Sequence, residues 1–212
     1  MPFQQGEMAA VLGRNGAGKT TFIRCIANLI AHQGSIVLEE DGKKLGRSSI
    51  AYLPQLEKIT SSLTTFETIL LGLTKTLSWK VSEAQLAKVS QVIRELKLDA
   101  FANTPVRSLS GGQKQLVFLA QSFVSEPRLL LLDEPTSALD VRHQLVVMET
   151  VHRYCKKRNA VALYVIHDLI LASRFSDAVL FLHNGMAHAF DTPDAVLNSE
   201  TIDPIYQIES LI

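Results

Sequence analysis

The sequence has little of what marks several large classes of protein. Among its 212 residues are only two cysteines, Cys25 and Cys155, without the density of a disulfide scaffold or the spacing of a zinc site. Reduced thiols in a cytoplasmic chain are the simplest interpretation. The longest apolar run, AVALYVI at 160–166, is far shorter than the ~18 residues of a membrane-spanning helix. The N-terminus also lacks the basic flank and apolar stretch of a secretory signal.

The chain also lacks an excess of charge of either sign. Lys and Arg number 21, and so do Asp and Glu. Proteins that bind duplex nucleic acid usually carry a basic excess, so we expect no nucleic-acid partner. The hydrophobic fraction of 47% is that of an ordinary globular core. The length fits one compact domain, or one domain with an inserted subdomain.

Apolar, strand-like segments alternate with helical patterns along the chain. This order predicts an α/β fold with a mostly parallel sheet covered by helices. The expected parallel strands are residues 8–12, 50–53, 129–132 and 161–166. Residues 35–40 lead into Asp41-Gly42, and residues 178–183 lead into Asn184-Gly185. Each pair favours the tight turn of an antiparallel hairpin.

Between residues 60 and 125 the pattern becomes helical. Three possible capping boxes begin helices there: Thr64 with Glu67, Ser82 with Gln85, and Ser110 with Gln113. We therefore expect one domain over residues 1–212. Its core would comprise residues 1–59 and 126–212, with a helical subdomain inserted at about 60–125.

Residues 13–20, GRNGAGKT, match the phosphate-binding pattern G-x-x-x-x-G-K-[ST] in full. In such a loop glycines let backbone N–H groups point at phosphate oxygens, the lysine reaches the β and γ phosphates, and the last hydroxyl binds Mg²⁺. A chance match in a glycine-rich turn is the alternative. The strand before the loop counts against it, as does the amphipathic helix expected after it, with apolar Phe22, Ile23, Ile26, Leu29 and Ile30. The residues expected to bind ATP are Gly13, Arg14, Asn15, Gly16, Ala17, Gly18, Lys19, Thr20 and Thr21.

The segment LLLLDE, residues 129–134, places two carboxylates at the end of a strand apolar enough to be buried on both faces. Carboxylates so close to a core are costly unless a charge lies opposite. Mg²⁺ held by Asp133 would supply that charge, and Glu134 would accept a proton from an attacking water. An ordinary acidic pair at a strand end is the alternative.

Gln55 and His167 carry little information individually, but each follows an expected strand, as do Gly13 and Asp133. Ligands of open α/β sheets bind at the carboxyl ends of the strands. We therefore expect these four positions to converge. Gln55 would sense the metal and the water, and His167 would contact the γ-phosphate. The expected metal ligands are Thr20, Gln55 and Asp133.

A second glycine-rich stretch, LSGGQ, occupies residues 109–113. A helix N-cap would explain Ser110 and Gln113. It would not explain two adjacent glycines, which each cost a helix ~1 kcal/mol relative to alanine. Gly111 and Gly112 instead favour close approach of a ligand to the backbone, and so a second anion site. Spacing alone leaves open whether the anion belongs to the same chain.

These motifs, with SALD at 137–140 and in this order, make the whole chain resemble an ABC-transporter ATPase subunit. The resemblance implies a P-loop NTPase fold, ATP and Mg²⁺ as cofactors, and an ATP-dependent head-to-tail homodimer. It further implies that Glu134 is the general base, that His167 and Gln55 assist catalysis, and that Asp140 lies in the dimer contact. The loop that would hold the partner's γ-phosphate comprises Ser110, Gly111, Gly112 and Gln113.

A finer resemblance concerns the importers of iron-siderophores, haem and cobalamin. The segments PTSALDVRHQ (135–144), VIHDLILASRFSDAVLFLHNG (165–185) and TPDAVLNSETIDPIYQIE (192–209) are most similar to their ATPases. The resemblance implies transmembrane permease subunits as partners and, through them, a periplasmic or surface substrate-binding protein. It places the chain peripherally, at the cytoplasmic face of the inner or plasma membrane.

The chain departs from the family before the phosphate loop. Family members carry there an antiparallel segment with an aromatic residue that stacks on adenine, whereas Gly13 here has only twelve residues before it. Phe3 lies where a core residue is expected. Either the start lies upstream, or this is a shortened copy with a compromised base pocket. The alternatives to an importer ATPase are a truncated, impaired paralogue and a soluble ABC ATPase that acts on DNA or ribosomes.

Overall fold

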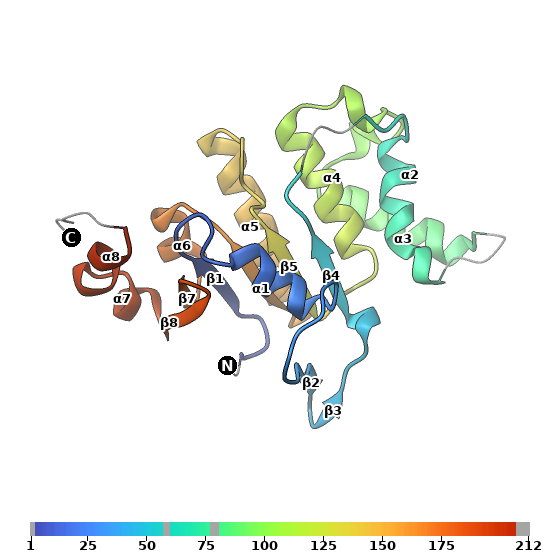
Figure 1. Cartoon of the computed structure of the whole chain (residues 1–212). Helices are drawn as coiled ribbons and strands as arrows, with labels where there is room; N and C mark the ends of the chain where they lie inside the picture. The colour runs from blue at the N-terminus through green and yellow to red at the C-terminus, as the bar shows by residue number, and fades with distance from the viewer. Residues whose placement is uncertain (1–2, 57–59, 77–80, 207–212) are drawn as a thin grey trace.

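The computed structural model describes residues 3–56, 60–76 and 81–206 (Figure 1). Six strands form one sheet in the order β4-β5-β6-β1-β7-β8. The first five are parallel to one another, and β8 runs antiparallel to β7. The prediction of a mostly parallel sheet is therefore confirmed. The strands are β1 (Met8–Leu12), β4 (Ile50–Leu53), β5 (Leu129–Asp133), β6 (Val161–Val165), β7 (Ala178–His183) and β8 (Met186–Asp191).

Helices cover both faces of this sheet, which explains why every residue of β1 is buried. Side chains alternate between the faces, so Met8 and Ala10 belong to one apolar cluster and Ala9 and Val11 to the other. The second cluster packs against α1 (Lys19–Ile26). The first packs against α4 (Gly111–Phe123), α5 (Val141–Arg158), α6 (Leu169–Phe175), α7 (Pro193–Val196) and α8 (Ser199–Tyr206) (Figure 1).

Helix α1 is shorter than the apolar pattern predicts. It ends at Ile26, and Asn28 takes a left-handed φ of 56°. Leu29 and Ile30, expected on its buried face, are 59% and 37% exposed. The left-handed conformation of Asn28 cannot continue the helix, so the helical periodicity does not extend to Leu29 and Ile30. Phe3 packs against the core, as expected. Its ring lies edge-on to that of Phe190, with the two ring centroids 5.7 Å apart.

Both predicted hairpins turn where expected. At each turn the two central residues have positive φ, as a type I′ turn requires. The β7–β8 hairpin is long, but the other comprises only β2 (Glu39–Glu40) and β3 (Lys43–Lys44). The prediction of a strand that begins at residue 35 is therefore wrong for residues 35–38, because β2 begins only at Glu39. Ile36 and Val37 are 47% and 55% exposed, so little burial holds this stretch extended.

The region between β4 and β5 is helical, as predicted, and all three capping boxes form. Its helices share a separate apolar cluster that includes Ile69, Val89 and Val117. The predicted boundary at residue 59 falls on 57–59, outside the described residues. Besides α4, the region contains α2 (Thr65–Leu70), η2 (Leu71–Thr76), α3 (Glu83–Glu95), η3 (Asp99–Phe101) and η4 (Val106–Ser108); η1 (Arg47–Ser49) precedes β4.

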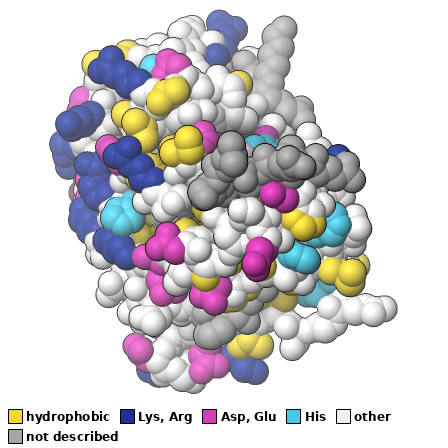
Figure 2. All heavy atoms as spheres, turned by 90° about the vertical axis from the view of Figure 1, so that its left-hand side faces the viewer, with side chains coloured by type: hydrophobic (Ala, Val, Ile, Leu, Met, Phe, Trp, Pro, Cys, Tyr) yellow, Lys and Arg dark blue, Asp and Glu magenta, His cyan; other side chains and the backbone are white. Residues whose placement is uncertain are grey.

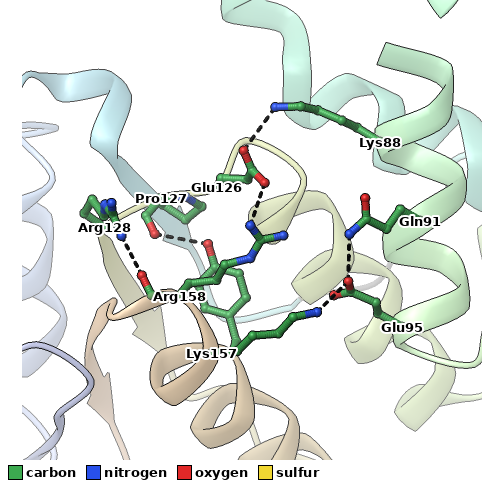
Figure 3. A network of polar contacts seen from close by, with 9 residues as sticks. Lys88, Gln91, Glu95, Glu126, Pro127, Arg128, Lys157 and Arg158 are labelled. Carbon is green, nitrogen blue, oxygen red and sulfur yellow. Dashed lines mark hydrogen bonds and ion pairs between the residues drawn. The ribbon is translucent and has the colours of Figure 1, made fainter. Parts of the chain in front are cut away.

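Ion pairs join α3 to the strand-bearing part of the molecule (Figure 3). Glu126, in the loop before β5, binds Lys88 of α3 at 3.1 Å and Arg158 of α5 at 2.9 Å. Lys157 binds Glu95 at 2.7 Å. These side chains are partly exposed, so each pair contributes only ~0.2–1 kcal/mol. Together they orient α3 relative to α5.

Charges of both signs mix on the molecular surface. In Figure 2, Lys and Arg side chains gather along one edge, with Asp and Glu side chains close by. The last turn of α5 shows the same mixing, because each of its three basic residues has an acidic partner. In the part of the chain that the structure describes, no helix has both the length and the apolar character needed to cross a bilayer.

Candidate functional site

The loop at residues 13–20 connects β1 to α1 and exposes the start of that helix. Gly13, Gly16 and Gly18 have φ values of 142°, 82° and 94°, which other residues adopt only under strain. A Cβ at Gly13 would also lie 2.2 Å from the carbonyl oxygen of Leu182, so no side chain fits there. Gly18 is the N-cap of α1 and offers no side-chain cap. The first N–H groups of α1 are thus available to an external anion.

The side chain of Lys19 lies along this loop and is only 6% exposed. Its ammonium donates to the carbonyl oxygens of Gly13 at 2.7 Å and Arg14 at 3.0 Å. Burial lowers the pKa of Lys19, and the nearby carboxylates of Glu134 and Asp133 partly oppose this. A desolvated cation beside free backbone N–H groups suits a polyanion such as a triphosphate. Of the other loop residues, Ala17 is buried, whereas Asn15 and Thr21 are exposed.

Thr20 and Asp133, predicted to share a metal ion, are brought together. Asp133 ends β5 and is 2% exposed, and the Thr20 hydroxyl donates to its Oδ1 at 2.9 Å. Tyr52 of β4 donates to Oδ2 at 3.4 Å, a contact that sequence reasoning missed. Burial raises the pKa of Tyr52, so its hydroxyl remains a donor. The only signal for it in the sequence is its place one residue before the end of the strand next to β5.

This pair fits a Mg²⁺ ion that is completed by a substrate. Among the described residues, no group of three or more His, Cys, Asp and Glu side chains could hold a metal ion. Thr20 and Asp133 supply one hydroxyl and one carboxylate, and Mg²⁺ typically takes its remaining ligands from water and phosphate.

Glu134 lies at the centre of the predicted catalytic group. Gln55 donates to its Oε2 at 2.9 Å, and the Nε2 atom of His167 lies 2.9 Å from its Oε1. The three side chains follow β4, β5 and β6, which are neighbours in the sheet. Glu134 has a left-handed φ of 51°, and its side chain is 21% exposed. Two of the four positions expected to converge, Gln55 and His167, thus meet on Glu134 at this edge of the sheet.

The second glycine-rich stretch begins α4. Ser110 Oγ accepts from the N–H of Gln113 at 3.3 Å, and the Gln113 side chain accepts from the N–H of Ser110 at 3.0 Å. Gly111 and Gly112 are the first two residues of the helix. In the described part of the chain, no hydrogen bond joins residues 110–113 to residues 13–20. Asp140 caps α5 and is 66% exposed.

A family model described as "ABC transporter" matches residues 1–137, the stretch that contains the phosphate loop, LSGGQ, Asp133 and Glu134. The chain belongs to the ABC transporter family. An uncharacterized ABC transporter ATP-binding protein of Methanocaldococcus jannaschii is 35% identical to it, over 99% of this chain and 84% of the relative. The hemin import ATP-binding protein of Mesorhizobium japonicum is 32% identical, over 95% and 81%.

A solved chain of an inward-facing, metal-chelate type ABC transporter has the same fold. It superposes with a TM-score of 0.89 at 26% identity, over 99% of this chain and 81% of that chain. The ABC family and the α/β P-loop fold expected from the sequence are thus confirmed. As an ATP-binding chain of an ABC transporter, this protein is an ATPase and a subunit of a membrane-associated complex.

Proposed function

We propose that this ABC chain hydrolyses MgATP at residues 13–20 and thereby powers import of an iron-siderophore or related metal chelate. The observation that carries the hydrolytic part is the carboxylate of Glu134, held between Gln55 and His167 beside the phosphate loop. The proposal of a metal chelate as cargo is supported by the hemin import relative and by the metal-chelate type transporter.

In this proposal the phosphates lie on the loop glycines and on the first turn of α1. Lys19 leaves its two carbonyl partners and binds the β and γ phosphates. Thr20, Gln55 and Asp133 would hold Mg²⁺. When bound, Mg²⁺ neutralises charge on the phosphate oxygens. His167 contacts the γ-phosphate.

Glu134 takes the proton of the attacking water. Its carboxylate is an acceptor only, and two donors hold it in one orientation. The partly buried position limits the water molecules that reach it, so a water between Glu134 and a γ-phosphate has few competitors. The Nε2–H of His167 donates to Glu134 in this arrangement, so the same N–H must turn away from Glu134 to reach the γ-phosphate.

The test is a comparison of Glu134→Gln with Lys19→Ala. Glu134→Gln keeps the shape but not the base, so we expect turnover to fall by ~10²–10⁴-fold while ATP binding persists. Lys19→Ala should lose ATP binding itself. Glu149→Gln, an exposed carboxylate of α5, is the matched control and should retain the parental rate. Hydrolysis at the parental rate by Glu134→Gln would refute the assignment of Glu134 as the general base.

We further propose that two chains face each other head to tail, so that Ser110, Gly111, Gly112 and Gln113 close on the partner's γ-phosphate with Asp140 in the contact. Support comes from the helix start at Gly111, where the first N–H groups have no intrahelical partner. Ser110→Arg should then leave ATP binding to the monomer intact and abolish ATP-dependent dimerisation, measured by light scattering.

Mixing Ser110→Arg with Lys19→Ala chains tests action between chains. A hybrid dimer carries both lesions at one composite site and none at the other. We expect the mixture to dimerise with ATP more than either variant alone. If Ser110→Arg alone dimerises and hydrolyses normally, the loop does not act on a partner.

Docking to a permease is supported by a groove of about 760 Å³ between β4 and the helical region. Apolar Leu53, Leu71 and Phe118 line it, and Leu71 is 42% exposed. We propose that permease subunits bind here, at the cytoplasmic face of the membrane, and that a substrate-binding protein acts through them. Leu71→Asp should abolish uptake of a radiolabelled ferric chelate in cells while the purified chain keeps its ATPase rate. Undiminished uptake by Leu71→Asp would show that the permease binds outside this groove.

A further inference from the structure

The start of α4 lies directly against a histidine of α5. A Cβ built on Gly112 would lie 2.2 Å from Cδ2 and 2.7 Å from Cγ of His143. The imidazole thus fills the space that any side chain at position 112 would need. Gly112 has no left-handed φ, so backbone strain does not require glycine here, but a side chain could enter only if the ring of His143 moved.

The ring of His143 is held in place from its other side. Its Nδ1 atom lies 2.8 and 2.9 Å from the two carboxylate oxygens of Asp140, the N-cap of α5. Hydrogen bonds from the backbone N–H and then the ring of His143 lower the pKa of Asp140. The two side chains are 41% and 66% exposed, so burial alone does not fix this arrangement.

A second contact joins the same two segments. The Cβ position of Gly111 lies 3.5 Å from Cδ2 of Leu139, in the turn that leads from Glu134 to Asp140. That turn is braced at its beginning, where the Ser137 hydroxyl donates to the carbonyl oxygen of Glu134 at 3.0 Å. Leu139 and His143, which follow the turn of Glu134, therefore lie beside the two glycines of the LSGGQ loop.

We propose that His143 is a positioning residue for ATP hydrolysis, which fixes the start of α4 against residues 137–140. It does not touch the nucleotide. It acts through Gly112 and Asp140, and so sets where the N–H groups of the LSGGQ loop lie relative to the turn of Glu134. The inference rests on the proposed role of that loop in holding a γ-phosphate.

The first test compares His143→Ala, which removes the ring, with His143→Gln, which retains a donor able to reach Asp140. A misplacement of about 1 Å can cost ~10²-fold in rate, so we expect looser positioning in His143→Ala to lower kcat by about tenfold. ATP binding to the monomer should stay within about twofold, because the phosphate loop is untouched. His143→Gln should recover most of kcat. His152→Ala, an exposed histidine of the same helix, should match the parent.

The second test asks whether the Gly112 contact exists in solution. Gly112→Ala should lower the Tm of the parent by up to about 4 °C, because the new methyl group displaces the ring from Asp140. In the His143→Ala background the same change should have almost no effect, because the ring is gone. Equal losses of Tm in both backgrounds would show that the two residues do not meet.

The outcomes separate this inference from the proposed function. A parent chain without ATP turnover would refute the proposed function. An active parent with unchanged kcat in His143→Ala would refute the positioning role alone. A fall in kcat accompanied by an equal loss of monomer ATP affinity would also refute it, because positioning of the LSGGQ loop should spare that affinity.

Discussion

Gly72 is the residue whose replacement by alanine should most directly disturb the packing of the helical region. It lies in η2 against α4, and a Cβ built there would be 2.0 Å from the carbonyl oxygen of Gln121 and 2.6 Å from Cγ1 of Val124. Ordinary contacts of this kind begin at 3.4 Å. Because one opposing atom belongs to the backbone of α4, a change of rotamer cannot relieve the overlap, and η2 must move away from α4.

The size of the effect follows from this overlap. Overpacking of a closed contact typically costs ~1–3 kcal/mol. In a domain of this size each kcal/mol corresponds to a Tm shift of ~2–4 °C, so Gly72→Ala should lower Tm by about 2–12 °C. Differential scanning calorimetry measures this shift directly.

Gly46→Ala is the matched control. Its φ of −82° suits alanine, and the nearest atom to the new methyl group would be the Ser48 hydroxyl at 3.9 Å. The loss of chain entropy in the unfolded state should leave its Tm unchanged or slightly raised. Parental Tm in Gly72→Ala would refute the contact between η2 and α4, and an equal loss in both variants would show a general cost of alanine.

Three further predictions concern the junction in Figure 3 and the cysteines. The hydrogen bond from Lys88 of α3 lowers the pKa of Glu126 below its ordinary 4.5, so the stability that ionised Glu126 contributes is complete above pH 4.5 and lost in acid. The Tm of the parent should exceed that of Glu126→Gln at about pH 6, and the two Tm values should become equal by about pH 3. Tyr154→Phe removes the donor to the carbonyl of Pro127, which lies 3.0 Å away, and should cost ~1–3 kcal/mol in chemical denaturation. Burial raises the pKa of Cys155 to about 12, so a thiol reagent at neutral pH should label the partly exposed Cys25 first and reach Cys155 only on unfolding; equal labelling rates in the folded chain would contradict this.

Features set by local sequence could be predicted, and features set by packing could not. The phosphate loop, the capping boxes and the Asn184-Gly185 turn each depend on a few consecutive residues. The convergence of Gln55 and His167 followed from their places after strands. Tyr52 and His143 were missed because their roles depend on which helix or strand lies opposite.

The errors in the strand at 35–38 and in the end of α1 have one physical origin. Apolar periodicity predicts a buried face only where another layer covers it. Leu29 and Val37 remain exposed in the structure despite the pattern.

The place of β1 in the sheet has a consequence for how the chain is made. Its two neighbours are β6 and β7, which begin at Val161 and Ala178. During synthesis β1, which carries the phosphate loop, therefore emerges well before either of the strands that it pairs with. Five apolar residues must stay unpaired throughout that interval, which exposes them to aggregation and to chaperones. Nucleotide binding should thus be acquired only after β6 and β7 have been translated, although the loop that confers it precedes both strands in the chain.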